Sequence, residues 1–465
     1  MYEDLADFSL KYLQDKGAKY AEVRLEESKS NDFVLKNGNL EVASFNEITG
    51  IGIRFTVNDT LGFLNINLLE KEKIKTIIEK AIKVTKNSSK IGEKTKFSEE
   101  KAHTAKYSIK QKKSVDESPD SKLKEIFEID KIIKNVDNRF ISVDDSLVKK
   151  YYINSDGSRI ISEIPRTSLF YFLTILHNKK SIQRHFMYGS TKGYECLKEW
   201  NIHENLAEEV KALTNNLKNG ISIKPGTMDL VTAPEVTGIA VHESCGHPLE
   251  ADRILGREGA QAGESFVKKD MIGEKIGSDA INIYDDPTME ESYGFYLYDD
   301  EGVKARKKYL QKKGVITEFL QNRQTAVEFN IKSNGSARAS AFDREPLIRM
   351  SNTLVEPGNF SENEIFEGIK KGIYLKSFME WNIDDKRWQQ KYVGSEAYLI
   401  ENGKITKPVI APVLEITTPA LWSSVDALSK KMEFFAGPCG KGEPMSPIAV
   451  YMGGPHMRLR DVYIR

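Results

Sequence analysis

The run HESCGH at residues 242–247 contains two histidines and a glutamate that directly follows the first of them. Zinc hydrolases need these groups, because neutral histidine nitrogens bind the metal and a glutamate takes a proton from the metal-bound water. Histidine is scarce, with 7 in 465 residues, so the pattern rarely arises by chance. It predicts a zinc site with His242 and His247 as ligands and Glu243 as general base; two ordinary helix histidines are the alternative interpretation.

The two histidines are five residues apart, whereas the familiar zinc helix spaces them four apart. On a regular α-helix five residues turn the side chain by about 140°, which is too far for one ion. A local shift to i→i+5 hydrogen bonding widens the turn and lets the rings converge. Gly246 tolerates this distortion, and Pro248 cannot donate to the preceding ladder. We therefore predict a helix from Pro234 to about Arg253 with a π-bulge or a break at the site.

A catalytic zinc site usually has three protein ligands and an open position, so a third ligand is expected from elsewhere in the chain. Cys439 is the best candidate, because it lies in a glycine-rich loop, residues 437–442, and Lys441 nearby favours the thiolate. Cys245 is a rival on a similar helical face, although a small apolar core residue is the favoured interpretation there. His456 is a weaker rival.

The stretch HESCGHPLEAD, residues 242–252, resembles the signature helix of the metal-bearing TldD branch of the TldD/PmbA zinc metallopeptidases. Further blocks resemble that family in order and spacing and cover most of residues 224–465: Lys224–Gly226, Arg349–Thr353, Glu396–Gly403 and Cys439–Pro455. The N-terminal half agrees more loosely, through Asn37-Gly38 and residues 50–54. The resemblance is therefore specific for the second half of the chain.

The resemblance implies one zinc ion per chain on His242, His247 and Cys439, with Glu243 as general base. It also implies hydrolysis of peptide bonds in unfolded or short peptides inside an enclosed chamber. The implied assembly is a homodimer or a heterodimer with a PmbA-like paralogue that lacks the metal motif. Between residues 374 and 392, where the family usually has a glycine-rich segment, this chain has a charged run, so substrate preference is not carried over.

Two other classes of function remain open at this stage. The same ligands and base could serve a zinc amidohydrolase that removes an acyl group. The zinc could instead be structural, in a non-enzymatic assembly protein, and a closed four-ligand site including Cys245 or His456 would favour that interpretation. For an enzyme, Arg349 or a nearby tyrosine is expected to stabilise the oxyanion, and the sequence does not choose between them.

Composition limits the partners and the location. Lys and Arg total 68 and Asp and Glu total 68, so zero formal net charge gives no bulk attraction to nucleic acid or to an anionic membrane. No apolar run approaches the roughly 18 to 20 residues of a membrane span. The first residues, Met1 to Asp4, are acidic, unlike a signal peptide. These features predict a cytoplasmic protein with no nucleic-acid or membrane partner.

The pattern of apolar residues predicts an α+β protein of two domains. Residues 1–223 are expected to form a mixed α/β domain, interrupted by a solvated Lys/Ser-rich connection at about 86–122. Residues 224–465 are expected to form a largely antiparallel β domain that carries the zinc helix, with further helices at 361–372 and 423–431.

Two other segments of the second half could have functions. Residues 256–263 are rich in glycine and could form a flap over the site, although a plain turn is favoured. The acidic cluster Asp299-Asp300-Glu301 could bind a second cation, although a solvated charged turn is the favoured interpretation.

Overall fold

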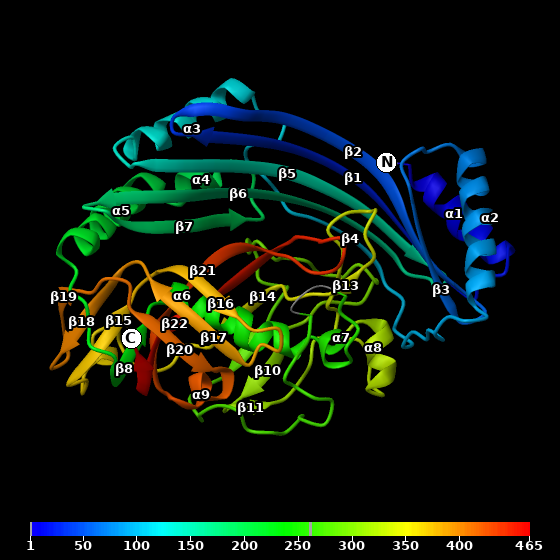
Figure 1. The fold of residues 1–465 in the computed structure, drawn as a ribbon. Coiled ribbons are helices and arrows are strands. Elements are labelled where there is room, and N and C mark those ends of the chain that lie inside the picture. Colours follow the sequence, from blue (N-terminus) through cyan, green and yellow to red (C-terminus); the bar gives the residue numbers. More distant parts are fainter. Residues whose placement is uncertain (1, 260–262) are drawn as a thin grey trace.

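The first half of the chain forms a long, curved antiparallel sheet. The computed structural model describes residues 2–259 and 263–465, and Figure 1 shows this sheet arching over the second half of the chain. Within the described residues the strand order is β3-β2-β1-β5-β6-β4, and β7 also pairs with β6. The strands are β1 (Tyr20–Lys36), β2 (Asn39–Val57), β3 (Thr60–Ile66), β4 (Thr104–Ser108), β5 (Asn138–Asn154), β6 (Arg159–His177) and β7 (Lys180–Ser190).

Helices cover the outer face of this sheet at its two ends (Figure 1). Helices α1 (Glu3–Asp15) and α2 (Lys71–Ser88) pack on one end, where Ile74, Ile78 and Ile82 form a buried stripe at helical spacing. Helices α3 (Pro119–Ile132), α4 (Cys196–Glu199) and α5 (Ile202–Asn219) lie at the other end. Side chains alternate along β1, so its other face is directed toward the second half of the chain.

The predicted solvated connection at 86–122 is partly wrong. It contains β4, which pairs in parallel with β6, and it ends inside α3. The side chains of β4 are only exposed or partly buried, so its sequence carries no apolar signal. Backbone pairing at the sheet edge holds this strand instead.

The second half is built around a larger sheet, in which thirteen strands are described. The pairing is antiparallel except between β14 and β22 and between β8 and β15. Its strands are β8 (Gly226–Thr232), β9 (Ile283–Asp285), β10 (Lys308–Lys312), β11 (Val315–Ile316), β14 (Asn352–Val355), β15 (Lys371–Leu375), β16 (Phe378–Ile383), β17 (Gln389–Gly394), β18 (Ala397–Glu401), β19 (Lys404–Pro408), β20 (Val413–Thr417), β21 (Val425–Cys439) and β22 (Ile448–Ile464).

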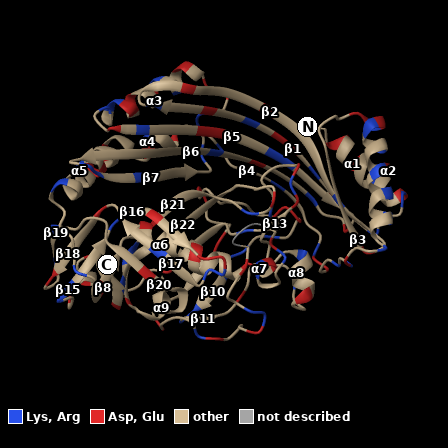
Figure 2. Cartoon of the chain, viewed as in Figure 1, with Lys and Arg blue, Asp and Glu red and all other residues tan. Residues whose placement is uncertain are grey.

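The remaining elements of this half are short. Strands β12 (Ala337–Arg338) and β13 (Leu347–Ile348) pair with each other. The short helices are α6 (Pro234–Val241), α7 (Ala251–Ile254), α8 (Arg323–Glu328) and α9 (Thr418–Ser423). Figure 2 shows charges of both signs interspersed over both halves.

These observations confirm the predicted α+β class and correct two helices. Residues 361–372 contain only a 3₁₀ turn, Glu364–Phe366, before β15 begins, and residues 425–431 belong to β21. The first segment ends in β15, which pairs with β8 and β18, and the second segment pairs with β22. The two sheets fall on either side of residue 223, but the division into separately folding domains stays a prediction. The glycine-rich segment 256–263 includes residues 260–262, which lie outside the described residues.

The acidic cluster is neither a solvated turn nor a candidate cation site. Asp299 is 5% exposed and accepts hydrogen bonds from the backbone of Glu301 and Val303. Glu301 is 1% exposed and pairs with Arg54 of β2, which also donates to Glu22 at 2.7 Å. This buried ion cluster joins the second half of the chain to the first sheet.

Replacing Arg54 should therefore destabilise the protein strongly. In Arg54→Met two buried carboxylates lose their counter-charge, so the free energy of unfolding should fall by about 3–5 kcal/mol. Urea denaturation measures this change, and Lys16→Met, which breaks the exposed ion pair with Glu79, is the control that should leave stability nearly unchanged. An effect of Arg54→Met no larger than the control would contradict the structural role of this cluster.

Candidate metal centre

The backbone of the HESCGH run departs from a regular helix. Helix α6 leads into a π-helical turn, His242–Gly246, and then into a 3₁₀ turn, His247–Leu249. The predicted π-bulge is confirmed. Gly246 also has a packing role, because a Cβ at this position would lie 1.8 Å from the sulfur of Met350.

The structure brings His242, His247 and Cys439 together. Their possible ligand atoms all lie within 4.8 Å of one another, and the three side chains are 3–4% exposed. The Cys439 Sγ is 3.6 Å from Nε2 of His247. Within the described residues this is the one group of three or more such donors with this geometry.

The rival residues have other partners. The Cys245 thiol accepts a hydrogen bond from Gln311 Nε2 at 3.3 Å, and burial raises its pKa well above that of a free thiol. His456 lies 3.1 Å from the hydroxyl of Tyr374 and is not part of the group.

The three residues fit a zinc ion. Two imidazoles and a thiol supply the nitrogen and sulfur donors that zinc takes. Nδ1 of His242 is buried and has no hydrogen-bond partner among the described residues, which is costly unless a ligand satisfies it. Burial lowers the pKa of both histidines, which favours the neutral form that binds a metal.

The surroundings also favour the thiolate form of Cys439. Burial alone would raise the pKa of this thiol, but His247 and the Arg349 guanidinium outweigh that effect and lower it to about 7. Lys441, which the sequence suggested for this role, pairs instead with Asp252 at 2.7 Å and with Glu250 at 3.2 Å. Arg349 is buried and donates to the backbone oxygens of Cys439 and of Ser446, so it holds the loop that carries the thiol.

Glu250 orients His247. Its Oε2 lies 3.0 Å from Nδ1 of His247 and accepts from Nε of Arg253 at 2.6 Å. Burial raises the pKa of Glu250, but Lys441, His247 and Arg253 together hold it well below its usual value. An ionised carboxylate on Nδ1 fixes the ring so that Nε2 is directed at Cys439. The sequence placed Glu250 in the motif without giving it a role.

Glu243 lies beside this group and is not a member of it. The carboxylate is 4% exposed, and its Oε2 accepts a hydrogen bond from Nη1 of Arg387. Arg387 belongs to the turn between β16 and β17 and has a φ of 62°. Its backbone carbonyl accepts a hydrogen bond from the Thr418 hydroxyl at 2.7 Å, which fixes the position of the turn. Sequence reasoning missed Arg387, which lies in the charged run that departs from the family pattern.

A buried His-His-Cys group beside a buried glutamate defines a candidate site of a metal-dependent hydrolase. Family models match the chain at three places: residues 21–85 as PmbA/TldA metallopeptidase domain 1, residues 112–218 as the central domain, and residues 225–465 as the C-terminal domain. The chain therefore belongs to the TldD/PmbA metallopeptidase family.

Named relatives agree with this assignment. The chain is 31% identical over 438 residues to Metalloprotease MJ0996 from Methanocaldococcus jannaschii, covering 92% of this chain and 94% of the relative. It is 27% identical to a protein named Zinc metalloprotease TldD homolog from Saccharolobus solfataricus, covering 98% of each. The crystal structure of TldE from Thermococcus kodakarensis shares the fold, with a TM-score of 0.76 at 20% identity over 100% of this chain and 99% of that chain. None of the described helices is long and apolar enough to cross a membrane.

Glu250→Gln should weaken zinc binding by about 10- to 100-fold, because the amide cannot supply the charge that orients His247. Competition with a chromophoric chelator measures the affinity. Asp252→Asn is the matched control, since Asp252 contacts the same Lys441 but no histidine, and its affinity should stay near that of the parent protein. Equal effects of the two substitutions would contradict the role of Glu250.

Proposed function

We propose that this protein is a zinc-dependent metallopeptidase that hydrolyses peptide bonds in unfolded or short peptides. The observation that carries the proposal is the buried group of His242, His247 and Cys439 with Glu243 directly beside it. The names of the relatives, metalloprotease and zinc metalloprotease, support the reaction class. A zinc ion on these three residues would polarise the scissile carbonyl and lower the pKa of water.

The chain itself supplies the base in this proposal. Oε2 of Glu243 is held by Arg387, and Oε1 has no hydrogen bond to any described residue. Oε1 is therefore the atom that takes the proton of the attacking water and passes it to the leaving amine. Arg387 acts as a positioning residue, because its charge-assisted hydrogen bond fixes the carboxylate without touching the substrate.

The alternatives have less support from the contacts of these residues. A closed structural site would need a fourth ligand such as Cys245 or His456, and both have other partners. Removal of an acyl group would use the same atoms, and only the products distinguish it from peptide cleavage. We also propose a dimer, with a second copy or with a TldE-like partner, on the strength of the fold shared with TldE. Light scattering of the chain alone and of a mixture would separate the two assemblies.

Glu243→Ala should lower the cleavage of casein by about 100- to 10,000-fold, which is the usual contribution of a general base. Mass spectrometry of the products measures cleavage, and new amino termini distinguish a peptidase from a deacylase. Zinc content should stay at one ion per chain, because Glu243 is not among the clustered donors. Glu264→Ala, at an exposed glutamate, is the control. Undiminished cleavage by zinc-loaded Glu243→Ala protein would rule out this base.

Arg387→Met should lower kcat by about 10- to 100-fold with little change in KM and no loss of zinc, because Glu243 loses its orientation. Lys386→Met is the matched control, since Lys386 is the neighbouring residue and its side chain is 65% exposed. Arg387→Lys should recover part of kcat. Equal rates in Arg387→Met and Lys386→Met protein would show that the ion pair has no part in catalysis.

A further inference from the structure

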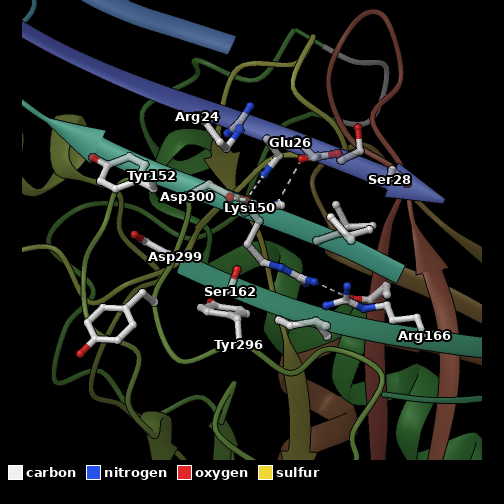
Figure 3. Close-up of a pocket in the computed structure, with 18 of the residues that line it drawn as sticks. Arg24, Glu26, Ser28, Lys150, Tyr152, Ser162, Arg166, Tyr296, Asp299 and Asp300 are labelled. Atoms are coloured by element: carbon white, nitrogen blue, oxygen red, sulfur yellow. Dashed lines mark hydrogen bonds and ion pairs between the residues drawn. The ribbon is translucent and has the colours of Figure 1, made fainter. Parts of the chain in front are cut away.

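A pocket of about 300 Å³ lies between the inner face of the first sheet and the second half of the chain. One wall consists of alternate residues of β1, β5 and β6 with Tyr107 of β4, and the other consists of residues 296, 298–300, 338–340 and 447–449. Figure 3 shows Arg24, Lys150 and Arg166 along the strands, with Asp299 and Asp300 on the facing loop. We call this space the arginine pocket.

Three arginines of this pocket have no ion pair. Arg24, Arg166 and Arg338 donate to backbone carbonyls, and no described carboxylate lies within 4.0 Å of their guanidinium nitrogens. Arg24 and Arg338 are 4% and 7% exposed, and the buried Nε of Arg24 has no hydrogen-bond partner among the described residues. A carbonyl accepts a hydrogen bond but does not neutralise the charge.

Three carboxylates face four cations in the lining of the pocket: Glu26, Asp299 and Asp300 against Arg24, Lys150, Arg166 and Arg338. Asp300 pairs with Lys150 at 2.9 Å and accepts from the backbone of Ala339, and Glu26 lies 3.7 Å from Lys150. Asp299 accepts from three backbone N–H groups. The charge left over in the pocket is therefore positive.

The pKa values of other buried arginines in this chain support the conclusion that these arginines lack a carboxylate partner. Burial lowers the pKa of Arg166, and it lowers the pKa of Arg338 to about 10. Arg54 and Arg184 are more deeply buried, each 2% exposed, but carboxylate partners raise the pKa of both above the ordinary value. A buried guanidinium favours a planar anion that can accept two parallel hydrogen bonds, and a carboxylate is such an anion.

The arginine pocket shares structure with the candidate metal centre. Ile448 lines the pocket and is the strand partner of Cys439. Arg338 donates to the carbonyls of Met350 and Ala449, and the sulfur of Met350 packs against Gly246 in the π-helical turn. A ligand on Arg338 would therefore lie beside the start of β22, which pairs with the strand that carries the proposed thiolate ligand.

We propose that the arginine pocket binds the C-terminal carboxylate of a peptide substrate. The proposal rests on the peptidase function proposed above and adds an anchor for one end of the substrate. The pocket volume suits a chain end and excludes a folded domain. The ring of Tyr296, with its centroid 5.3 Å from the Arg338 guanidinium, adds an apolar wall next to the charge.

Binding of two matched peptides tests the proposal without requiring turnover. The peptides have the same sequence, contain one internal glutamate, and end in a free carboxylate or in an amide. Titration calorimetry on zinc-loaded Glu243→Ala protein should give a Kd that is about 10-fold or more lower for the free acid. Arg166→Gln and Arg338→Gln in the same background should abolish this preference, because glutamine carries no charge.

The controls distinguish the loss of a pocket charge from the loss of another charge and from misfolding. Lys106→Met removes an exposed charge on β4, next to Tyr107 of the pocket, and should keep the full preference. Circular dichroism and zinc content identify a misfolded variant, and Arg166→Gln, whose residue is only partly buried, carries the test if Arg338→Gln does not fold.

Equal binding of acid and amide, or an unchanged preference in folded Arg166→Gln protein, would overturn the proposal. Tight binding of both peptides that is lost when the internal glutamate becomes glutamine would assign the pocket to a side-chain carboxylate and would also overturn it. A clear preference for the acid, together with wild-type protein that cleaves neither peptide, would support the arginine pocket and contradict the peptidase function.

Discussion

Strand β22 is the element on which the candidate metal centre depends. On one side it pairs with β8, which leads directly into α6 and the two histidines, and β21, which ends at Cys439, also pairs with it. Cys439 and His247 are 192 residues apart in sequence, yet their side chains meet at 3.6 Å. A shift of β21 by one residue against β22 would turn Cys439 to the opposite face of the sheet. The register between Cys439 and Ile448 is thus as important as the ligands themselves.

The part of the site that could be predicted from the sequence is the part with local causes. Histidines five residues apart cannot bind one ion on a regular α-helix, so their spacing, with Gly246 and Pro248, predicts a π-bulge or a break at the site. The chemistry of a cysteine in a glycine-rich loop, together with the family resemblance, was enough to nominate Cys439. Arg387 could not be found in this way, because its contact with Glu243 depends on where the turn between β16 and β17 lies in space. The two wrongly predicted helices failed for the same reason, since distant strands decide those segments.

The burial and pairing of charged side chains are the features that the sequence predicts least well. Equal numbers of acidic and basic residues suggest an unremarkable solvated surface, and a cluster such as Asp299 to Glu301 is usually exposed. Here the cluster lies between the two halves, where Arg54 and Lys150 compensate it. In the same region Arg24, Arg166 and Arg338 form no ion pair with a described carboxylate. The contact between the halves therefore combines fully paired ions, which stabilise the fold, with unpaired cations, which are available to a ligand.

The central claim is that His242, His247 and Cys439 bind one zinc ion, and X-ray absorption spectroscopy at the zinc edge tests it most directly. The account predicts a first shell of one sulfur at about 2.3 Å and two imidazole nitrogens at about 2.0–2.1 Å, with a light-atom ligand in the fourth position. Cys439→Ser should remove the sulfur signal, whereas Cys245→Ser should leave the spectrum unchanged. A shell with two sulfurs, or a sulfur signal that survives Cys439→Ser, would contradict the account.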